Sequence, residues 1–418
     1  MEQVRKTPRT RNQETTRQQK VDIHIKSKSP LELIEAVTYA NDNHEDFTLI
    51  WYGHVRDEPR FETVLVPQLR DVINYFKRYR TIENCVRFIS SITIEKVFVI
   101  LANLSRHELQ KSIKNLRDLE QVTYIYIYSE PGHDTDYPDW LEFQKVQGMF
   151  TNETELLLQL IEDVKSVNIL SFDILNIDGD ESSIRDLTKE TVKFLKSKLL
   201  IDHLLFLPAS DRGKRDVVLE FKNEYQGNPE QLKEIGRFAK TYKSEDAITW
   251  YTSGNCIHKI TNKALRLQDM AMIFRLRFFI TDLYQKLHAL SLKQWNNHPP
   301  LTVYRGTKLR SGDFEKIKRN NGSYIAMNSF VSASHNNDVA IAFGGISGSA
   351  RISRMFPGGR EDSLLKPILF EIQIDPQFVS VPFADIADYS LFPDEKEILF
   401  ALNMVFRIEN FSINEAGT

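Results

Sequence analysis

Short continuous apolar runs alternate with amphipathic stretches through the first half of this 418-residue chain. Such runs predict strands buried on both faces, here over residues 47–52, 96–101, 123–128 and 145–149. The stretches between and after them carry apolar residues at helical spacing, over residues 67–79, 83–92, 106–116 and 154–164. This alternation predicts a doubly wound α/β domain over residues 21–165.

The pattern changes after residue 165. Residues 166–186 include a polar, glycine-containing stretch, Asn176–Ser183, and are expected to link two domains. Helical patterns follow over residues 188–207, 229–243, 247–265 and 267–290, and strands dominate from Leu301 onward. This order predicts an α+β domain over residues 187–418, with two antiparallel β-sheets beside a helical lobe.

Composition and charge narrow the class of protein. The chain is 41% hydrophobic and 27% charged, as in ordinary soluble globular proteins, and its net charge of −3 favours neither nucleic acid nor an anionic membrane as partner. Two cysteines, Cys85 and Cys256, are too few for a disulfide framework or a zinc site. Residues 1–20 have the composition of a disordered leader. Because no secretion signal, membrane span or lipid-anchor tail is evident, a cytoplasmic protein is expected.

No pattern in the first predicted domain points to catalysis. Gly53-His54-Val55 lacks the glycine spacing of a dinucleotide-binding loop, and a lone aspartate such as Asp57 is typical of a turn. The predicted architecture is similar in outline to flavodoxin, receiver and Toll-interleukin-receptor-like folds. We expect this accessory domain to bind a protein partner or to regulate the second domain.

Three short pieces between residues 301 and 400 carry chemistry. They are Tyr304-Arg305-Gly306, Phe330–Ser334 and Glu395-Lys396-Glu397, each interpreted as a strand or a strand end. Because side chains alternate along a strand, Glu395 and Glu397 are expected on one face, where repulsion raises the pKa of at least one carboxyl. An arginine, a serine and two carboxylates suit the binding of a pyrophosphate and the stabilisation of a developing cation.

The ordered triple resembles the arginine-specific mono-ADP-ribosyltransferases, whose pattern is Arg-Gly, then Ser-x-Ser, then Glu-x-Glu. Upstream, Asn262-Lys-Ala-Leu265-Arg266 looks like the helical Asn-x-x-Leu-Arg segment that precedes the catalytic core of that family. The resemblance covers residues 190–410. It implies an enzyme without a metal that moves ADP-ribose from NAD, or from NADP, to arginine side chains of a protein and releases nicotinamide.

The resemblance also implies roles for the residues around the cofactor. Arg305 would grip its phosphates, and Gly306 would let the backbone approach the nicotinamide amide. Ser332 would bond the nicotinamide-side ribose or the catalytic glutamate, and Ser334 would support the strand within the same site. Phe343 would stack on nicotinamide or, alternatively, belong to the core.

Two carboxylates would share the chemistry. Glu397 would accept a hydrogen bond from the ribose 2′-hydroxyl and stabilise the oxocarbenium ion, whereas Glu395 would orient the acceptor guanidinium and help to remove its proton. The loop over residues 384–394, with Tyr389 and Phe392, resembles the segment of the family that recognises the protein substrate.

Two other functions fit the same residues. An NAD glycohydrolase, in which water replaces the acceptor, would need every site residue except Glu395. A catalytically inactive module would bind a nucleotide or a partner in the same cleft, although the intact arginine, serine and glutamates argue against it. Tyr251 and His258 are interpreted as packing residues, and Arg266 as solvated or paired.

Overall fold

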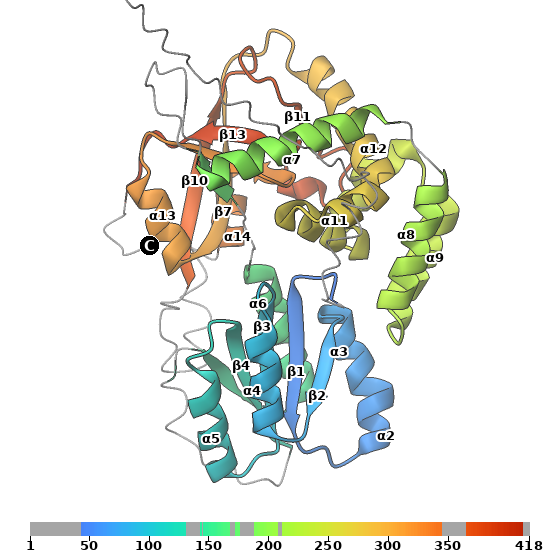
Figure 1. Ribbon diagram of the computed structural model, residues 1–418, viewed down its shortest axis with the longest axis vertical. Coiled ribbons are helices and arrows are strands. Elements are labelled where there is room, and N and C mark those ends of the chain that lie inside the picture. Colours follow the sequence, from blue (N-terminus) through green and yellow to red (C-terminus); the bar gives the residue numbers. More distant parts are fainter. Residues whose placement is uncertain are drawn as a thin grey trace, which may run out of the picture. The chain divides into compact units, whose positions relative to one another are not determined.

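The computed structural model describes residues 43–130, 143, 145–167, 172–175, 188–207, 211–344 and 365–412 (Figure 1). The expected leader over residues 1–20 and the stretch Asn176–Ser183 lie outside the described residues. Within the described ranges, strands form a five-stranded sheet of order β2-β1-β3-β4-β5, a five-stranded sheet of order β10-β7-β9-β12-β11, and a three-stranded sheet of order β13-β8-β6.

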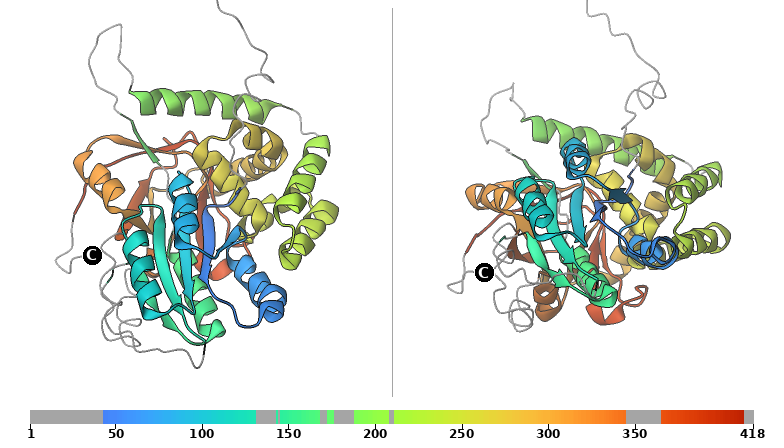
Figure 2. Two further views of the ribbon diagram at one scale, coloured as in Figure 1. Left: turned by 60° about the horizontal axis from the view of Figure 1, so that its bottom comes forward. Right: turned by 90° about the horizontal axis from the view of Figure 1, so that it is seen from below.

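The first sheet is parallel throughout. Its strands are β1 (Phe47–Gly53), β2 (Phe76–Tyr79), β3 (Lys96–Ala102), β4 (Val122–Tyr128) and β5 (Val146–Phe150). Apolar residues of α4 (Ile82–Ser91) and α5 (Arg106–Leu116) pack into one core, and those of α3 (Val66–Val72) and α6 (Glu153–Ser166) into another (Figures 1 and 2). Because two cores enclose the sheet, its central strands are buried on both faces, as their continuous apolar runs predicted.

One predicted helix of this region is wrong in part. Residues 67–79 were expected to be helical, but α3, which follows α2 (Glu58–Arg60) and η1 (Phe61–Leu65), ends at Val72. Residues Phe76–Tyr79 instead form the edge strand β2, paired with β1. All four β2 residues, Phe-Lys-Arg-Tyr, are half-buried, and the two charged ones interrupt the kind of apolar run that identified the neighbouring strands.

A helical lobe follows, with its core centred on the apolar residues of α12. Its elements are α7 (Lys189–Phe206), α8 (Asp211–Glu224), α9 (Pro229–Thr241), η3 (Ser244–Asp246), α10 (Ala247–Thr252), α11 (Cys256–Leu267) and α12 (Met270–Gln294). Side-chain oxygens of Thr188, Asn228, Asn255 and Asp269 cap α7, α9, α11 and α12. No helix in the described ranges is long and apolar enough to cross a membrane.

The helix predicted over residues 247–265 is two helices. Gly254, with φ of +65°, adopts the left-handed conformation between α10 and α11. Asn255 then caps α11 through its side chain. This break separates α10 from α11, and the two helices contact each other.

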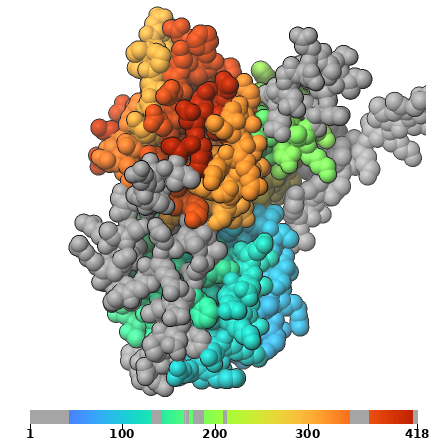
Figure 3. Space-filling view, turned by 90° about the vertical axis from the view of Figure 1, so that its left-hand side faces the viewer, coloured from blue at the N-terminus to red at the C-terminus, as the bar shows by residue number. Residues whose placement is uncertain are grey.

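The predicted pair of antiparallel sheets is confirmed. The larger consists of β7 (Leu301–Arg310), β9 (Val331–Ser334), β10 (Leu365–Ile374), β11 (Phe383–Asp385) and β12 (Glu397–Phe400). The smaller consists of β6 (Phe172–Leu175), β8 (Tyr324–Met327) and β13 (Met404–Arg407). Apolar residues of both sheets share one core, and Figure 3 shows the described residues that follow position 300 in orange to red.

Strand β6 corrects part of the expected linker. Residues 166–186 were interpreted as a connection between domains, but Phe172–Leu175 pair antiparallel with β8, and Phe172 and Ile174 enter the shared core. These four residues therefore belong to the same β-structure as residues 301–412. A run of only four residues whose partner lies about 150 positions later gives too weak a pattern to recognise in the sequence.

Candidate functional site

Three neighbouring strands bring the three predicted pieces together. In the larger antiparallel sheet, β9 lies between β7 and β12. Ser334 is paired across the ladder with Tyr304 on one side and with Glu397 on the other. The arginine, serine and glutamate pieces therefore meet side by side in the folded chain.

Arg305 is a half-buried cation with an unused donor. It lies in the middle of strand β7, and its Nη1 donates a 2.5 Å hydrogen bond to the Ser332 carbonyl. Burial lowers the pKa of Arg305, while Tyr251 and Glu397 act in the opposite direction. Its Nε is buried and has no hydrogen-bond partner among the described residues. A guanidinium held in this way is suited to binding an anion.

Glu397 is a buried carboxyl, with only 8% of its surface exposed. Burial raises its pKa to about 7, and the neighbouring Glu395 also raises it, whereas a Ser332 hydrogen bond and the charge of Arg305 lower it. Glu397 therefore titrates near neutral pH, which is unusual for a glutamate and typical of a reactive site.

The expected strand relationship between Glu395 and Glu397 is wrong. Glu395 ends the 3₁₀ helix η4 (Pro393–Glu395), Lys396 adopts left-handed angles of φ 46° and ψ 53°, and β12 begins only at Glu397. The two glutamates therefore do not alternate along one strand. They remain neighbours, because the charge of Glu395 still raises the pKa of Glu397, and burial raises the pKa of Glu395 as well.

Gly306 and Phe343 meet at the helix α14 (Asn337–Gly344). A Cβ on Gly306 would lie 1.7 Å from the Ala340 carbonyl oxygen, so this glycine admits α14 against β7. That contact gives Gly306 a structural reason, and the expected approach of its backbone to a nicotinamide stays a prediction. Phe343, on the same helix, is 52% exposed, so the alternative that it belongs to the core is wrong.

The loop over residues 384–394 is anchored at its base and exposed at its tip. Thr249 of α10 donates a 2.9 Å hydrogen bond to the Tyr389 carbonyl, and the Lys286 Nζ of α12 lies 5.1 Å from the centroid of the Tyr389 ring. At the tip, the Leu391 and Phe392 side chains are 53% and 51% exposed. Large apolar side chains held in solvent on an anchored loop are suited to contacting another protein.

The sequence analysis did not place residues of α10 and α11 at the candidate site. Tyr251 is buried, and its pKa responds to the charges of both Glu397 and Arg305, so it stands beside the site. It is hydrogen-bonded to Asn262 of the Asn-x-x-Leu-Arg segment. Arg266 of that segment is buried and ion-paired with Asp46, and not solvated. In the sequence, only Ser253-Gly254-Asn255, which is typical of a helix end, indicated that α10 and α11 are separate helices that fold against each other.

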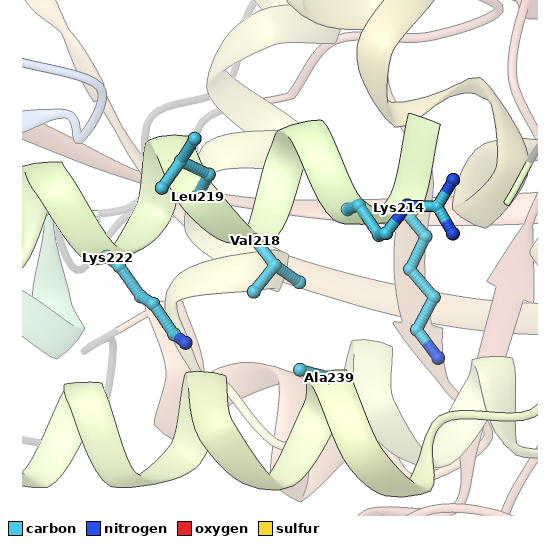
Figure 4. Close-up of a pocket in the computed structure, with 6 residues that line it drawn as sticks. Lys214, Val218, Leu219, Lys222 and Ala239 are labelled. Atoms are coloured by element: carbon cyan, nitrogen blue, oxygen red, sulfur yellow. The ribbon is translucent and has the colours of Figure 1, made fainter. Parts of the chain in front are cut away.

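A separate hollow lies between α8 and α9 (Figure 4). Its volume is about 390 Å³, and its lining includes Lys214, Val218, Leu219, Lys222 and Ala239. None of Arg305, Ser332, Glu395 and Glu397 lines it. Across the described residues, no three side chains of His, Cys, Asp or Glu are grouped so that they could hold a metal ion.

Comparisons with known proteins give distant likenesses only. No protein-family model matches the chain, and no curated protein matches it. The ADP-ribosyltransferase HopU1 of Pseudomonas syringae pv. tomato DC3000 is 18% identical over 53% of this chain and 93% of its own, with a TM-score of 0.32. Plx2a, an ADP-ribosyltransferase toxin from Paenibacillus larvae, is 18% identical over 49% of this chain and 91% of its own, with a TM-score of 0.30. The Clostridium limosum C3 exoenzyme is 13% identical over 56% of this chain and 93% of its own, also with a TM-score of 0.30. Any proposal of function therefore rests on the site itself.

Proposed function

We propose that this chain is a mono-ADP-ribosyltransferase that moves ADP-ribose from NAD to arginine side chains of proteins. One observation carries the proposal: Arg305, Ser332 and Glu397 meet on three adjacent strands, with the guanidinium bonded to the serine's carbonyl and the serine side chain near enough to the carboxyl to lower its pKa. A fixed cation beside a buried carboxyl matches a substrate that carries both a pyrophosphate and a bond whose cleavage generates positive charge.

The residues present fit the binding of NAD. The buried Arg305 Nε is a donor without a partner among the described side chains, and it would be satisfied by a phosphate oxygen. The exposed ring of Phe343 is available to stack on the nicotinamide. NADP would meet the same groups, so either dinucleotide is a candidate co-substrate.

Glu397 would act in the cleavage step. The bond between ribose C1′ and the nicotinamide nitrogen breaks, the electron pair leaves with nicotinamide, and the ribose acquires oxocarbenium character. The ionised Glu397 would accept a hydrogen bond from the 2′-hydroxyl and stabilise this charge at short range. The Ser332 hydroxyl, bonded to the same carboxyl, would hold it in place.

Glu395 and the exposed loop would act on the acceptor. The guanidinium nitrogen attacks C1′, and the proton that it loses passes to the Glu395 carboxylate. Glu395 stands at the end of the loop whose tip exposes Leu391 and Phe392, where a protein substrate would dock. This position supports arginine as the acceptor, because a carboxylate binds a guanidinium by charge-assisted hydrogen bonds.

NAD hydrolysis is the second candidate. It is favoured by one feature: Glu395 lies on a 3₁₀ turn and not on the strand that fixes Glu397. Attack by water needs only Glu397. If the Glu395 carboxylate moved away from the site, the enzyme would therefore hydrolyse NAD and would not transfer ADP-ribose.

For residues 43–167, we propose a doubly wound α/β accessory domain that binds a protein partner or regulates catalysis.

Labelled NAD distinguishes these functions. The full chain would be incubated with NAD labelled in its ADP-ribose part, with and without polyarginine. Label on polyarginine supports the transferase, and free ADP-ribose in both reactions supports the hydrolase. If neither product forms although the chain still binds NAD, the chain is a binding module and the proposal is overturned.

A further inference from the structure

Next to the site, the buried Tyr251 and the half-buried His258 and Asn262 form a closed ring of hydrogen bonds. The Tyr251 hydroxyl donates to the Asn262 Oδ1 at 3.0 Å, and the Asn262 Nδ2 lies 3.1 Å from the His258 Nε2. The His258 Nδ1 lies 2.8 Å from the main-chain carbonyl of Tyr251, which closes the ring. The Tyr251 and His258 rings are also in contact, with centroids 4.7 Å apart.

The direction of every bond in the ring follows from one fixed acceptor. A carbonyl only accepts, so the His258 Nδ1 carries the proton. Burial lowers the pKa of His258 to about 4, so at neutral pH its Nε2 is an acceptor and takes a hydrogen from the Asn262 amide. The Asn262 carbonyl then faces the Tyr251 hydroxyl, which donates. The ring therefore has one satisfied arrangement, which gives it a well-defined geometry.

The local fold explains how the ring forms. His258 and Asn262 are four residues apart on α11, so they lie on one face of that helix. Tyr251 belongs to α10, and the left-handed Gly254 folds the two helices together. The next residues of α11 face elsewhere: Lys259 pairs with Glu45 and Lys263 with Glu95.

The ring lies against the site. The Tyr251 ring is 5.3 Å from that of Phe330, which stands two residues before Ser332. Burial raises the pKa of Tyr251, and the charges of Glu397 and Arg305 also act on it in opposite directions. Tyr251 is thus within electrostatic reach of both charged groups of the site.

We propose that His258 is a positioning residue: by closing the ring with Asn262, it holds Tyr251 as the wall that keeps water away from Glu397 and Arg305. This inference deepens the proposed function and rests on it for its catalytic consequence. Its structural part, the shielding of the Glu397 carboxyl, can be measured without any substrate.

The test compares three variants of the full chain. Tyr251→Phe removes the hydroxyl from the ring, and His258→Phe removes both nitrogens while keeping an aromatic side chain. Tyr242→Phe is the matched control, because Tyr242 donates a 2.7 Å hydrogen bond to Asp282 elsewhere in the same helical lobe. Carboxyl titrations by ¹³C NMR of labelled glutamate, with Glu397→Gln to identify the signal, would follow Glu397 directly.

Opening the ring admits water, so the Glu397 titration should move to lower pH in Tyr251→Phe and His258→Phe and stay in place in Tyr242→Phe. The charged neighbours Glu395 and Arg305 remain in every variant, so they do not cause the difference. With NAD, kcat for nicotinamide release should fall about tenfold in the two ring variants, with KM little changed. An unmoved Glu397 titration in both ring variants would overturn the inference. A wild-type chain that released no nicotinamide would instead overturn the proposed function, whatever the titration.

Discussion

The Ser334 hydroxyl donates a 2.6 Å hydrogen bond to the main-chain carbonyl of Glu395 and accepts a 3.0 Å bond from the Asn336 amide. Ser334 also lies directly opposite Glu397 in the ladder between β9 and β12. The second serine of the motif is therefore committed to main-chain partners, and it ties the turn that carries Glu395 to the strand that carries Ser332.

The two serines should differ when each is replaced by alanine. Ser334→Ala frees the Glu395 turn, so transfer to an arginine acceptor should fall several-fold while nicotinamide release in water changes little. Ser332→Ala removes a hydrogen bond that lowers the pKa of Glu397, so the activity should require a higher pH. Steady-state rates across pH, with and without an acceptor, measure both effects. Identical profiles for the two variants would contradict the separate roles.

Glu395→Gln should separate transfer from hydrolysis. The amide keeps the size of the side chain but loses the charge that binds a guanidinium, which should cost about 2 kcal/mol, or roughly thirtyfold, in the transfer step. Release of nicotinamide to water should persist, because water needs no such contact. Equal loss of both activities would mean that Glu395 acts in cleavage or folding, and unchanged transfer would remove it from the site.

The raised pKa of Glu397 also predicts a pH-dependent stability. In the folded chain this carboxyl has a pKa of about 7, above its ordinary 4.5, so the folded state binds the proton more tightly than the unfolded state does. Stability contributed by this group is therefore present at low pH and is lost as pH rises from 4.5 through 7. Urea unfolding of wild type and Glu397→Gln should show the variant gaining relative stability over this window and no further above it. A difference that does not change with pH would contradict the shift.

A buried ion pair links α11 to the first sheet region. The Lys263 Nζ donates to the carbonyls of Asn43 and Glu45 and to the Glu95 carboxylate, at 2.8, 2.6 and 2.8 Å, and both side chains of the ion pair are less than 8% exposed. Lys263→Met should cost about 3–5 kcal/mol of unfolding free energy, because it leaves buried acceptors and a carboxylate without their cation. The surface pair Lys198–Asp202, more than 40% exposed, is the control, and Lys198→Met should cost less than about 1 kcal/mol. Similar losses in the two variants, measured by urea unfolding, would contradict a buried role.

The sequence was informative where residues of the right chemistry occur in a specific order along the chain. Arg305, Ser332 and Glu397 were predicted together from their order and strand context, and the fold places them on neighbouring strands. The antiparallel sheets were likewise predictable, because strand-forming runs dominate after Leu301.

Other features depend on contacts that no local pattern reveals. The left-handed Lys396 separates Glu395 from strand β12, which begins at Glu397, and a lysine gives no sign of that conformation. The contact of Gly306 with the carbonyl of Ala340, from a helix further along the chain, was likewise not evident in the sequence. Tyr251 and His258 were interpreted as packing residues because their ring closes only when α10 and α11 fold together.

The most direct measurement is the transfer of labelled ADP-ribose by wild type and by Glu397→Gln, alongside the affinity of each for NAD. Wild type should label polyarginine. Glu397→Gln should bind NAD about as well, because Arg305 supplies the phosphate contact, yet should neither label polyarginine nor release nicotinamide. A Glu397→Gln variant that retains most of the wild-type cleavage of NAD would contradict the assignment of this site.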